Sequence, residues 1–136
     1  MKHIKWFAVV GAGLVVASLA TANPVPAPGK AAASTERATM SGEIIDPQCY
    51  FTHDSRGPLH ASCAAMCAKG GQGLAFLQDT TGTVYALIGK THGASQNQGL
   101  LPYLGKGVQV KGVLYHKAGN SVLLIQSIAT SPARTR

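Results

Sequence analysis

The chain has 136 residues, with 12 Lys or Arg against 5 Asp or Glu, so its formal net charge at pH 7 is +7. The basic residues are scattered and form no run, which argues against a nucleic-acid-binding stripe and favours simple solubility. The three cysteines fall within 19 consecutive residues, Cys49 to Cys67, and this is the strongest concentration of reactive side chains in the sequence.

The first 22 residues have the pattern of a secretory signal peptide. Basic residues Lys2 and Lys5 precede an apolar run from Trp6 to Ala20, and Ala-Thr-Ala at 20–22 forms a cleavage site of the A-x-A type. The apolar run is shorter than the roughly 20 residues that span a membrane. We therefore expect a periplasmic or secreted protein without membrane attachment after cleavage; an uncleaved anchor is the alternative.

Three further segments follow the signal. Residues 23–38 are rich in Pro and Ala and have no apolar periodicity, which predicts a flexible linker. Residues 39–130 form one small domain by length, and residues 131–136 are expected to be a disordered tail. A domain of this size has a limited core and often gains stability from a cross-link or a metal ion.

The domain shows the pattern of five short strands. A first strand at 39–46 ends at Asp46-Pro47, and a hairpin at 73–79 and 82–89 turns at residues 79–82. Residues 106–130 repeat the hairpin pattern with a turn at 117–120, after a loop with one helical turn at 100–104. This order predicts a mainly β, five-stranded OB-fold-like barrel, with residues 47–71 as a helical insert between strands one and two.

The closing phrase GVQVKGVLYHKAGNSVLLIQSI (107–128) resembles the final two strands of small exported bacterial OB-fold proteins. The resemblance extends from Ser41 to Ile128 and implies the same barrel; the cysteine-rich insert departs from the better-known members. The phrase G-x-I-x-D-x-x-C-Y … H-x-x-C-A-x-x-C also resembles uncharacterised exported proteins, and this second likeness implies no function.

The insert predicts a metal site. Gly57-Pro58 and Gly70-Gly71 are typical of a helix start and stop, and the residues between them include four alanines. On a helix, His60, Cys63 and Cys67 fall within an arc of about 60°. Cys49 lies in the preceding loop, close enough along the chain to fold back onto this face. Together the four residues form a Cys₃His set, which suits a tetrahedral zinc ion.

A disulfide is the main alternative. Two of three cysteines in an oxidising compartment normally pair, and Cys49 with Cys63 or Cys67 fits disulfide geometry better than Cys63 with Cys67 on one helical turn. The disulfide leaves one cysteine and an aligned histidine unexplained, whereas a metal ion uses all four side chains. We therefore favour the metal.

Zinc is the first choice of metal and copper(I) the alternative, because thiolate-rich sites accept both. The C-x₃-C spacing of Cys63 and Cys67 with a histidine is similar to that of Sco-type copper-delivery proteins, but the thioredoxin-like scaffold of that family is absent. His53, Asp54, Tyr50 and Met66 are weaker candidates for the site, and we expect the first two to be solvated.

No catalytic constellation is recognisable, since there is no paired set of carboxylates and no nucleophile motif. We therefore expect a binding protein rather than an enzyme, with a metal ion and a periplasmic protein as partners. The second hypothesis is a disulfide-stapled interaction module that binds a peptide, glycan or protein. Its ligand would lie on strands two and three near Phe76, Tyr85 and Leu87, or on the loop at 90–105.

Overall fold

A computed structural model describes residues 33–132. The signal peptide, the linker as far as residue 32 and the last four residues of the tail lie outside the described residues. Within residues 33–132, no helix has the length and apolar character needed to cross a membrane.

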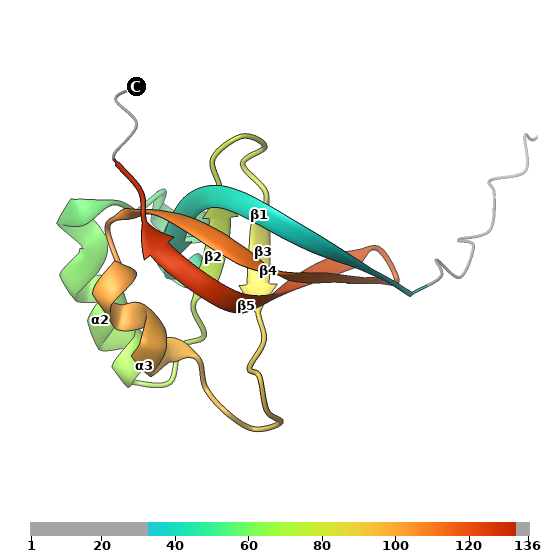
Figure 1. Cartoon of the computed structure of the whole chain (residues 1–136). Helices are drawn as coiled ribbons and strands as arrows, with labels where there is room; N and C mark the ends of the chain where they lie inside the picture. Colours follow the sequence, from blue (N-terminus) through green and yellow to red (C-terminus); the bar gives the residue numbers. More distant parts are fainter. Residues whose placement is uncertain (1–32, 133–136) are drawn as a thin grey trace, which may run out of the picture.

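Five strands close into a barrel in the order β1-β2-β3-β5-β4, with β3 parallel to β5 and every other neighbouring pair antiparallel (Figure 1). The prediction of a mainly β, five-stranded barrel with a helical insert between the first two strands is confirmed. The strands are β1 (Ser34–Ile45), β2 (Ala75–Gln78), β3 (Val84–Leu87), β4 (Gly107–Lys117) and β5 (Asn120–Thr130). The helices are α1 (Pro47–His53), η1 (Pro58–His60), α2 (Ala61–Lys69), α3 (Asn97–Leu100) and η2 (Leu101–Tyr103).

Strand β1 begins at Ser34, five residues before the strand expected from the sequence. Its first residues are mostly exposed and carry no apolar alternation, so periodicity could not reveal them. They form a strand because they pair with the far end of β4, where Ser34 lies opposite His116. Backbone pairing alone defines this part of the strand.

The barrel core follows the alternation of β4, in which Val108, Val110 and Leu114 point inward. Phe76 is fully buried in the same cluster and stacks on Tyr85 at a ring-centroid distance of 6.5 Å. The sequence-based expectation of a ligand face that includes Phe76 is therefore wrong, because its side chain fills the interior. Gly42 in β1 makes room for this ring, since a Cβ there would lie 2.6 Å from a Phe76 ring carbon.

The insert is fixed to the barrel through α2 and α3, which pack against each other at one end of the molecule (Figure 1). Ala64 and Ala68 turn the buried side of α2 toward the core. The buried Asn97 of α3 donates hydrogen bonds to the carbonyls of Ala68 at 3.0 Å and Gln72 at 2.8 Å. Its Oδ1 accepts one from the Leu74 N–H at 3.3 Å. One amide side chain thus holds the end of α2 in place.

Candidate metal centre

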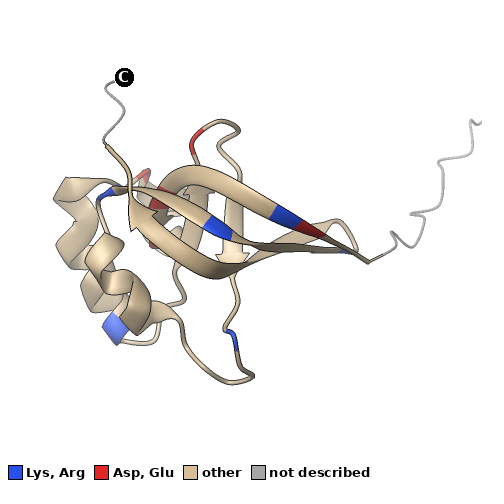
Figure 2. Cartoon of the chain, viewed as in Figure 1, with Lys and Arg blue, Asp and Glu red and all other residues tan. Residues whose placement is uncertain are grey.

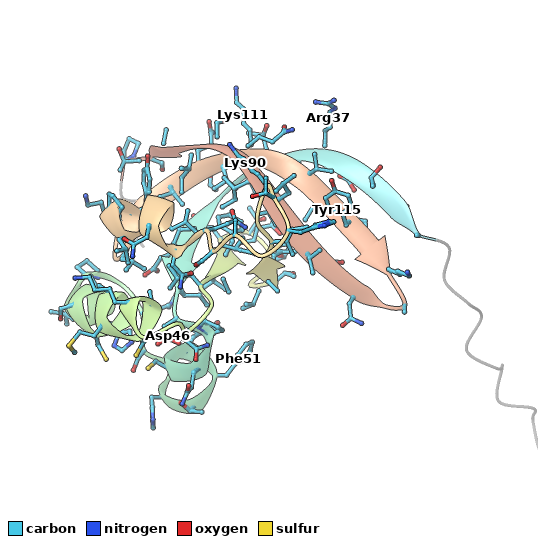
Figure 3. All side chains as sticks on the ribbon, turned by 90° about the horizontal axis from the view of Figure 1, so that it is seen from below. Arg37, Asp46, Phe51, Lys90, Lys111 and Tyr115 are labelled. Carbon is cyan, nitrogen blue, oxygen red and sulfur yellow. The ribbon has the colours of Figure 1, made fainter. Side chains whose placement is uncertain are left out.

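The structure brings the three cysteines together. The Sγ atoms of Cys49, Cys63 and Cys67 all lie within 4.8 Å of one another. Cys63 and Cys67 are four residues apart on one face of α2, and Cys49 comes from α1. All three cysteines of the chain are half-buried free thiols, so no pair stands at disulfide distance. Figure 3 shows side-chain sulfur atoms gathered beside α2.

Cys49 reaches this position because it lies on a helix rather than in the expected loop. Asp46 is the N-cap of α1, and its Oδ1 accepts hydrogen bonds from the backbone N–H groups of Gln48 at 2.9 Å and Cys49 at 3.3 Å. Pro47 occupies the first turn, where a missing N–H costs nothing. The Asp-Pro pair that ends β1 therefore also starts α1. The sequence pattern indicated only the first of these roles.

A second group of potential ligands overlaps the first. Ligand atoms of Asp46, Cys49 and His60 also lie within 4.8 Å of one another. Asp46 is 1% exposed, and its Oδ2 makes no hydrogen bond to an N–H or O–H group. The Nε2 atom of His60 is likewise buried without a hydrogen-bond partner. Buried polar atoms are rarely left without a hydrogen-bond partner, so each of these two atoms requires an explanation.

A small cavity of about 10 Å³ has Asp46 and His60 among its lining residues, but none of the three cysteines. A cavity of this size holds about one water molecule. It is therefore separate from the space between the three thiols.

His60 is displaced from the position that helical periodicity predicts. It ends the 3-10 turn η1, and α2 begins one residue later at Ala61. A 3-10 turn has about 3.0 residues per turn instead of 3.6, so His60 is rotated relative to the face of Cys63 and Cys67. The structure accordingly groups His60 with Asp46 and Cys49, whereas Cys63 and Cys67 are grouped with Cys49 alone.

Three residues of the cluster, Asp46, Cys49 and Cys67, have shifted pKa values. Burial raises the pKa of the Cys49 thiol to about 11, and the neighbouring Asp46 carboxylate adds to the shift. The pKa of Cys67 is raised first by its hydrogen bond to Asp46 and then by burial. Burial acts to raise the pKa of Asp46, but hydrogen bonds from the Cys67 and Cys49 thiols and from the backbone outweigh it and lower the pKa. Without a cation, the Asp46 carboxylate thus holds its charge more readily than usual, whereas the Cys49 and Cys67 thiols hold their protons more tightly.

The donor set fits a tetrahedral metal ion. Sulfur ligands of a zinc ion at about 2.3 Å stand about 3.8 Å apart, so the three thiols need only a small contraction from their present separation. Asp46 and His60 each offer the oxygen or nitrogen donor that a fourth position requires. Asp46 was not among the ligands predicted from the sequence. Its place three residues before Cys49, at a helix N-cap, is the signal that could have indicated it.

The weaker candidates lie apart from the cluster. His53 and Asp54 are exposed, and Asp54 caps the end of α1 in a left-handed conformation. Tyr50 packs against Ile45, Ala75 and Leu77. Met66 is 67% exposed on the outer face of α2.

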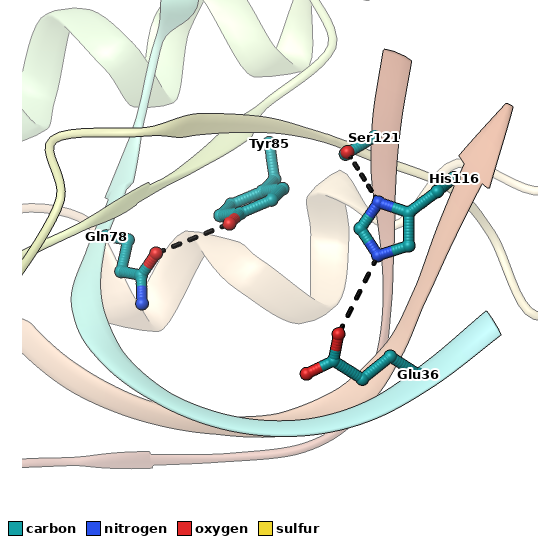
Figure 4. Close-up of polar contacts among 5 residues, drawn as sticks. All are labelled: Glu36, Gln78, Tyr85, His116 and Ser121. Carbon is teal, nitrogen blue, oxygen red and sulfur yellow. Dashed lines mark hydrogen bonds and ion pairs between the residues drawn. The ribbon is translucent and has the colours of Figure 1, made fainter. Parts of the chain in front are cut away.

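One further polar cluster lies at the distant hairpin (Figure 4). The Nδ1 atom of His116 is 2.7 Å from Ser121 Oγ, and its Nε2 is 3.9 Å from a Glu36 carboxylate oxygen. His116 and Ser121 are cross-strand partners, and the Glu36 side chain is 67% exposed. These contacts connect the start of β1, the end of β4 and the start of β5. In the same view, the Tyr85 hydroxyl donates to Gln78 on the neighbouring strand.

Comparison of the chain with protein-family models, with curated proteins and with solved structures finds no match.

Proposed function

We propose that this protein is an exported metal-binding module of OB-like fold, in which Cys49, Cys63 and Cys67 bind a zinc ion. Asp46 or His60 supplies the fourth ligand. The observation that carries the proposal is the coincidence of three thiols that form no disulfide with two buried atoms that lack an N–H or O–H partner, Asp46 Oδ2 and His60 Nε2. Export is proposed from the N-terminal pattern of basic start, apolar run and A-x-A site.

Zinc fits the donor set better than copper(I). Copper(I) is satisfied by soft sulfur ligands alone, and the three thiols would suffice for it. That arrangement would leave the carboxylate and the imidazole without a role. Zinc takes sulfur, nitrogen and oxygen donors together, so a zinc ion gives one of these two groups a role as its fourth ligand.

The role that the geometry supports best is structural. α1 is a seven-residue helix without fully buried residues, and its apolar packing comes from the partly buried Tyr50, which lies against a small second core cluster. A metal ion held between Cys49 on α1 and Cys63 and Cys67 on α2 would fix the two helices to each other. Binding free energy at such a site is also folding free energy.

Cobalt substitution tests the site directly. The full chain, reduced and freed of metal, is titrated with Co²⁺ and then with Zn²⁺ under anaerobic conditions. A tetrahedral site with three thiolates binds one equivalent of Co²⁺. The complex shows strong thiolate-to-cobalt charge-transfer bands and visible bands of the intensity typical of tetrahedral cobalt, and added Zn²⁺ abolishes both sets of bands. Weak visible absorption typical of octahedral cobalt, without charge-transfer bands, would contradict the proposal.

A further inference from the structure

A larger cleft lies away from the cysteines, between the β3–α3 connection and β5. Its volume is about 330 Å³, and its walls come from residues 89–100 on one side and 125–128 on the other. None of the four cysteine or histidine site residues lines it. This volume is at the lower end of the range for ligand pockets, large enough for one sizeable side chain or a small molecule.

The cleft borders an open strand edge. β5 pairs with β3 only at Val122 and Leu123, and the Ile88 N–H extends this contact by donating to the Leu123 carbonyl at 3.1 Å. From Leu124 onward, β5 has β4 on one side, and no described strand covers the other side. Near the end of this segment the Ile128 carbonyl accepts a hydrogen bond from the Tyr103 hydroxyl at 3.3 Å, so the free part of the edge is centred on residues 124–127. An exposed strand edge offers backbone donors and acceptors to an extended peptide.

The lining of the cleft combines apolar and cationic features. Leu100 and Ile125 are buried, and Ile128 packs against the same core cluster. The Nε2 atom of Gln96 is buried without a hydrogen-bond partner. Lys90 is exposed among the lining residues, which include no acidic side chain. The cleft is therefore suited to a ligand that has an apolar group next to a negatively charged one.

A second positive charge lies close to the cleft. Lys111 of β4 is the cross-strand partner of Ser127, which lines the cleft. Figure 3 shows Lys111 and Lys90 on the same side of the barrel. Figure 2 shows the other Lys and Arg residues of the described chain spread over separate segments rather than gathered around one cleft. The local field at the cleft thus favours an anion.

We propose that this cleft binds the C-terminal residue of an extended peptide from a partner protein. The β5 edge takes the peptide backbone, the cleft takes an apolar last side chain, and Lys90 and Gln96 take the terminal carboxylate. This combination explains why an open edge, an apolar floor and unpaired donors occur together. A free organic acid with the same apolar group offers the same anchor chemistry but cannot use the strand edge. The site is independent of the metal centre.

Binding is measured by amide chemical shifts of the ¹⁵N-labelled full chain. Three probes are compared: an acetylated pentapeptide ending in leucine with a free carboxylate, the same peptide as its C-terminal amide, and 4-methylpentanoate. The free-acid peptide is expected to shift amides of residues 89–100 and 124–128. The amide and the small acid should each bind at least about tenfold more weakly, because the amide lacks the charge and the small acid lacks the edge contacts.

Two pairs of variants localise the site. A Cβ at Gly99 or at Gly73 would meet no atom within 4 Å, but only Gly99 lines the cleft. Gly99→Leu should therefore fill the cleft and weaken peptide binding at least about tenfold, whereas Gly73→Leu should leave it unchanged. Lys90→Glu should weaken binding about fivefold or more, while Lys117→Glu at the exposed end of β4 should not.

Three results would overturn the proposal. The first is the absence of shifts in residues 89–100 and 124–128 at millimolar free-acid peptide. The second is equal binding of 4-methylpentanoate and the peptide, which would assign the cleft to small organic acids. The third is a wild-type dimer that Gly99→Leu converts to a monomer, which would place a second copy of the chain in the cleft.

Discussion

The carboxylate of Asp46 accepts a hydrogen bond from the backbone N–H of Cys49 at 3.3 Å and also contacts the Cys67 thiol of a different helix. One residue thus starts the helix that carries Cys49 and joins it to the helix that carries Cys67. Its second oxygen remains without an N–H or O–H partner. The geometry of the thiol cluster therefore depends on Asp46 as much as on the cysteines.

Asp46→Asn separates the two roles of this residue. Asparagine is as good an N-cap as aspartate, so the metal-free variant should keep nearly the same free energy of unfolding. The loss of the charge and of an oxygen ligand should lower zinc affinity by about 10- to 100-fold. The affinity is measured by competition with a chromogenic chelator.

His60→Gln is the comparison for Asp46→Asn. Asp46 contacts two thiols whereas His60 is grouped with one, so we expect the smaller loss of zinc affinity in His60→Gln. Unchanged zinc affinity in both variants would show that neither residue is a ligand. In that case the site would be a three-thiolate site, which copper(I) fits better.

Cys63→Ser and Cys67→Ser should each lower zinc content and thermal stability together. The reason is that removal of one thiolate loses binding free energy that the folded state alone receives. Ser62→Ala, at an exposed neighbouring position on α2, is the control and should change neither property. Metal content and Tm are measured on the same samples with and without a chelator. A fall in Tm that persists at equal size in the chelated protein would assign the cysteines to packing alone.

The raised pKa of Cys49 predicts how the metal-free, reduced protein responds to alkali. The folded-state pKa is about 11, against an ordinary value of 9.0, so the unfolded chain loses this proton first as the pH rises. The contribution of the protonated Cys49 thiol to the free energy of unfolding is fully present below about pH 9. It is lost as the pH rises from about 9 to about 11. In the zinc-loaded protein the thiols are already deprotonated, so the same decline should be absent. Chemical denaturation across this range tests both statements.

Asn97→Ala should loosen α2 and thereby the metal centre. The side chain makes three hydrogen bonds to the backbone of residues 68–74, and its removal leaves buried groups without partners. We expect a loss of roughly 3 kcal/mol in the free energy of unfolding of the metal-free protein, measured with urea. Gln98→Ala, at an exposed site of the same helix, should stay within about 0.5 kcal/mol of wild type. Equal stability of the two variants would contradict this account.

Much of the barrel follows from local pattern. The turns at 79–82 and 117–120, between apolar strands, are enough to predict both hairpins, and Gly70-Gly71 predicts the end of α2. Gly57-Pro58 instead precedes the 3-10 turn η1, and α2 itself begins at Ala61. The start of β1 could not be predicted, because its residues show no apolar alternation and are ordered by long-range pairing with β4.

The candidate site was predictable only where one helix carries it. Cys63 and Cys67 share a face of α2, as a period of 3.6 residues requires. The short helix α1 has no buried residues and hence no apolar stripe, so nothing in its periodicity indicated that it would carry Cys49. Asp46 was read only as the end of a strand. Its role at the cluster depends on the way α1 and α2 pack in three dimensions.

Native mass spectrometry of the full chain, expressed with its own N-terminal segment and purified without added metal or reductant, tests the central claim most directly. The account predicts one zinc ion per chain under native conditions and three free thiols in the denatured, unreduced protein. A metal-free chain whose mass lacks two hydrogens, with a single thiol left to titrate, would contradict it and show that two of the three cysteines form a disulfide.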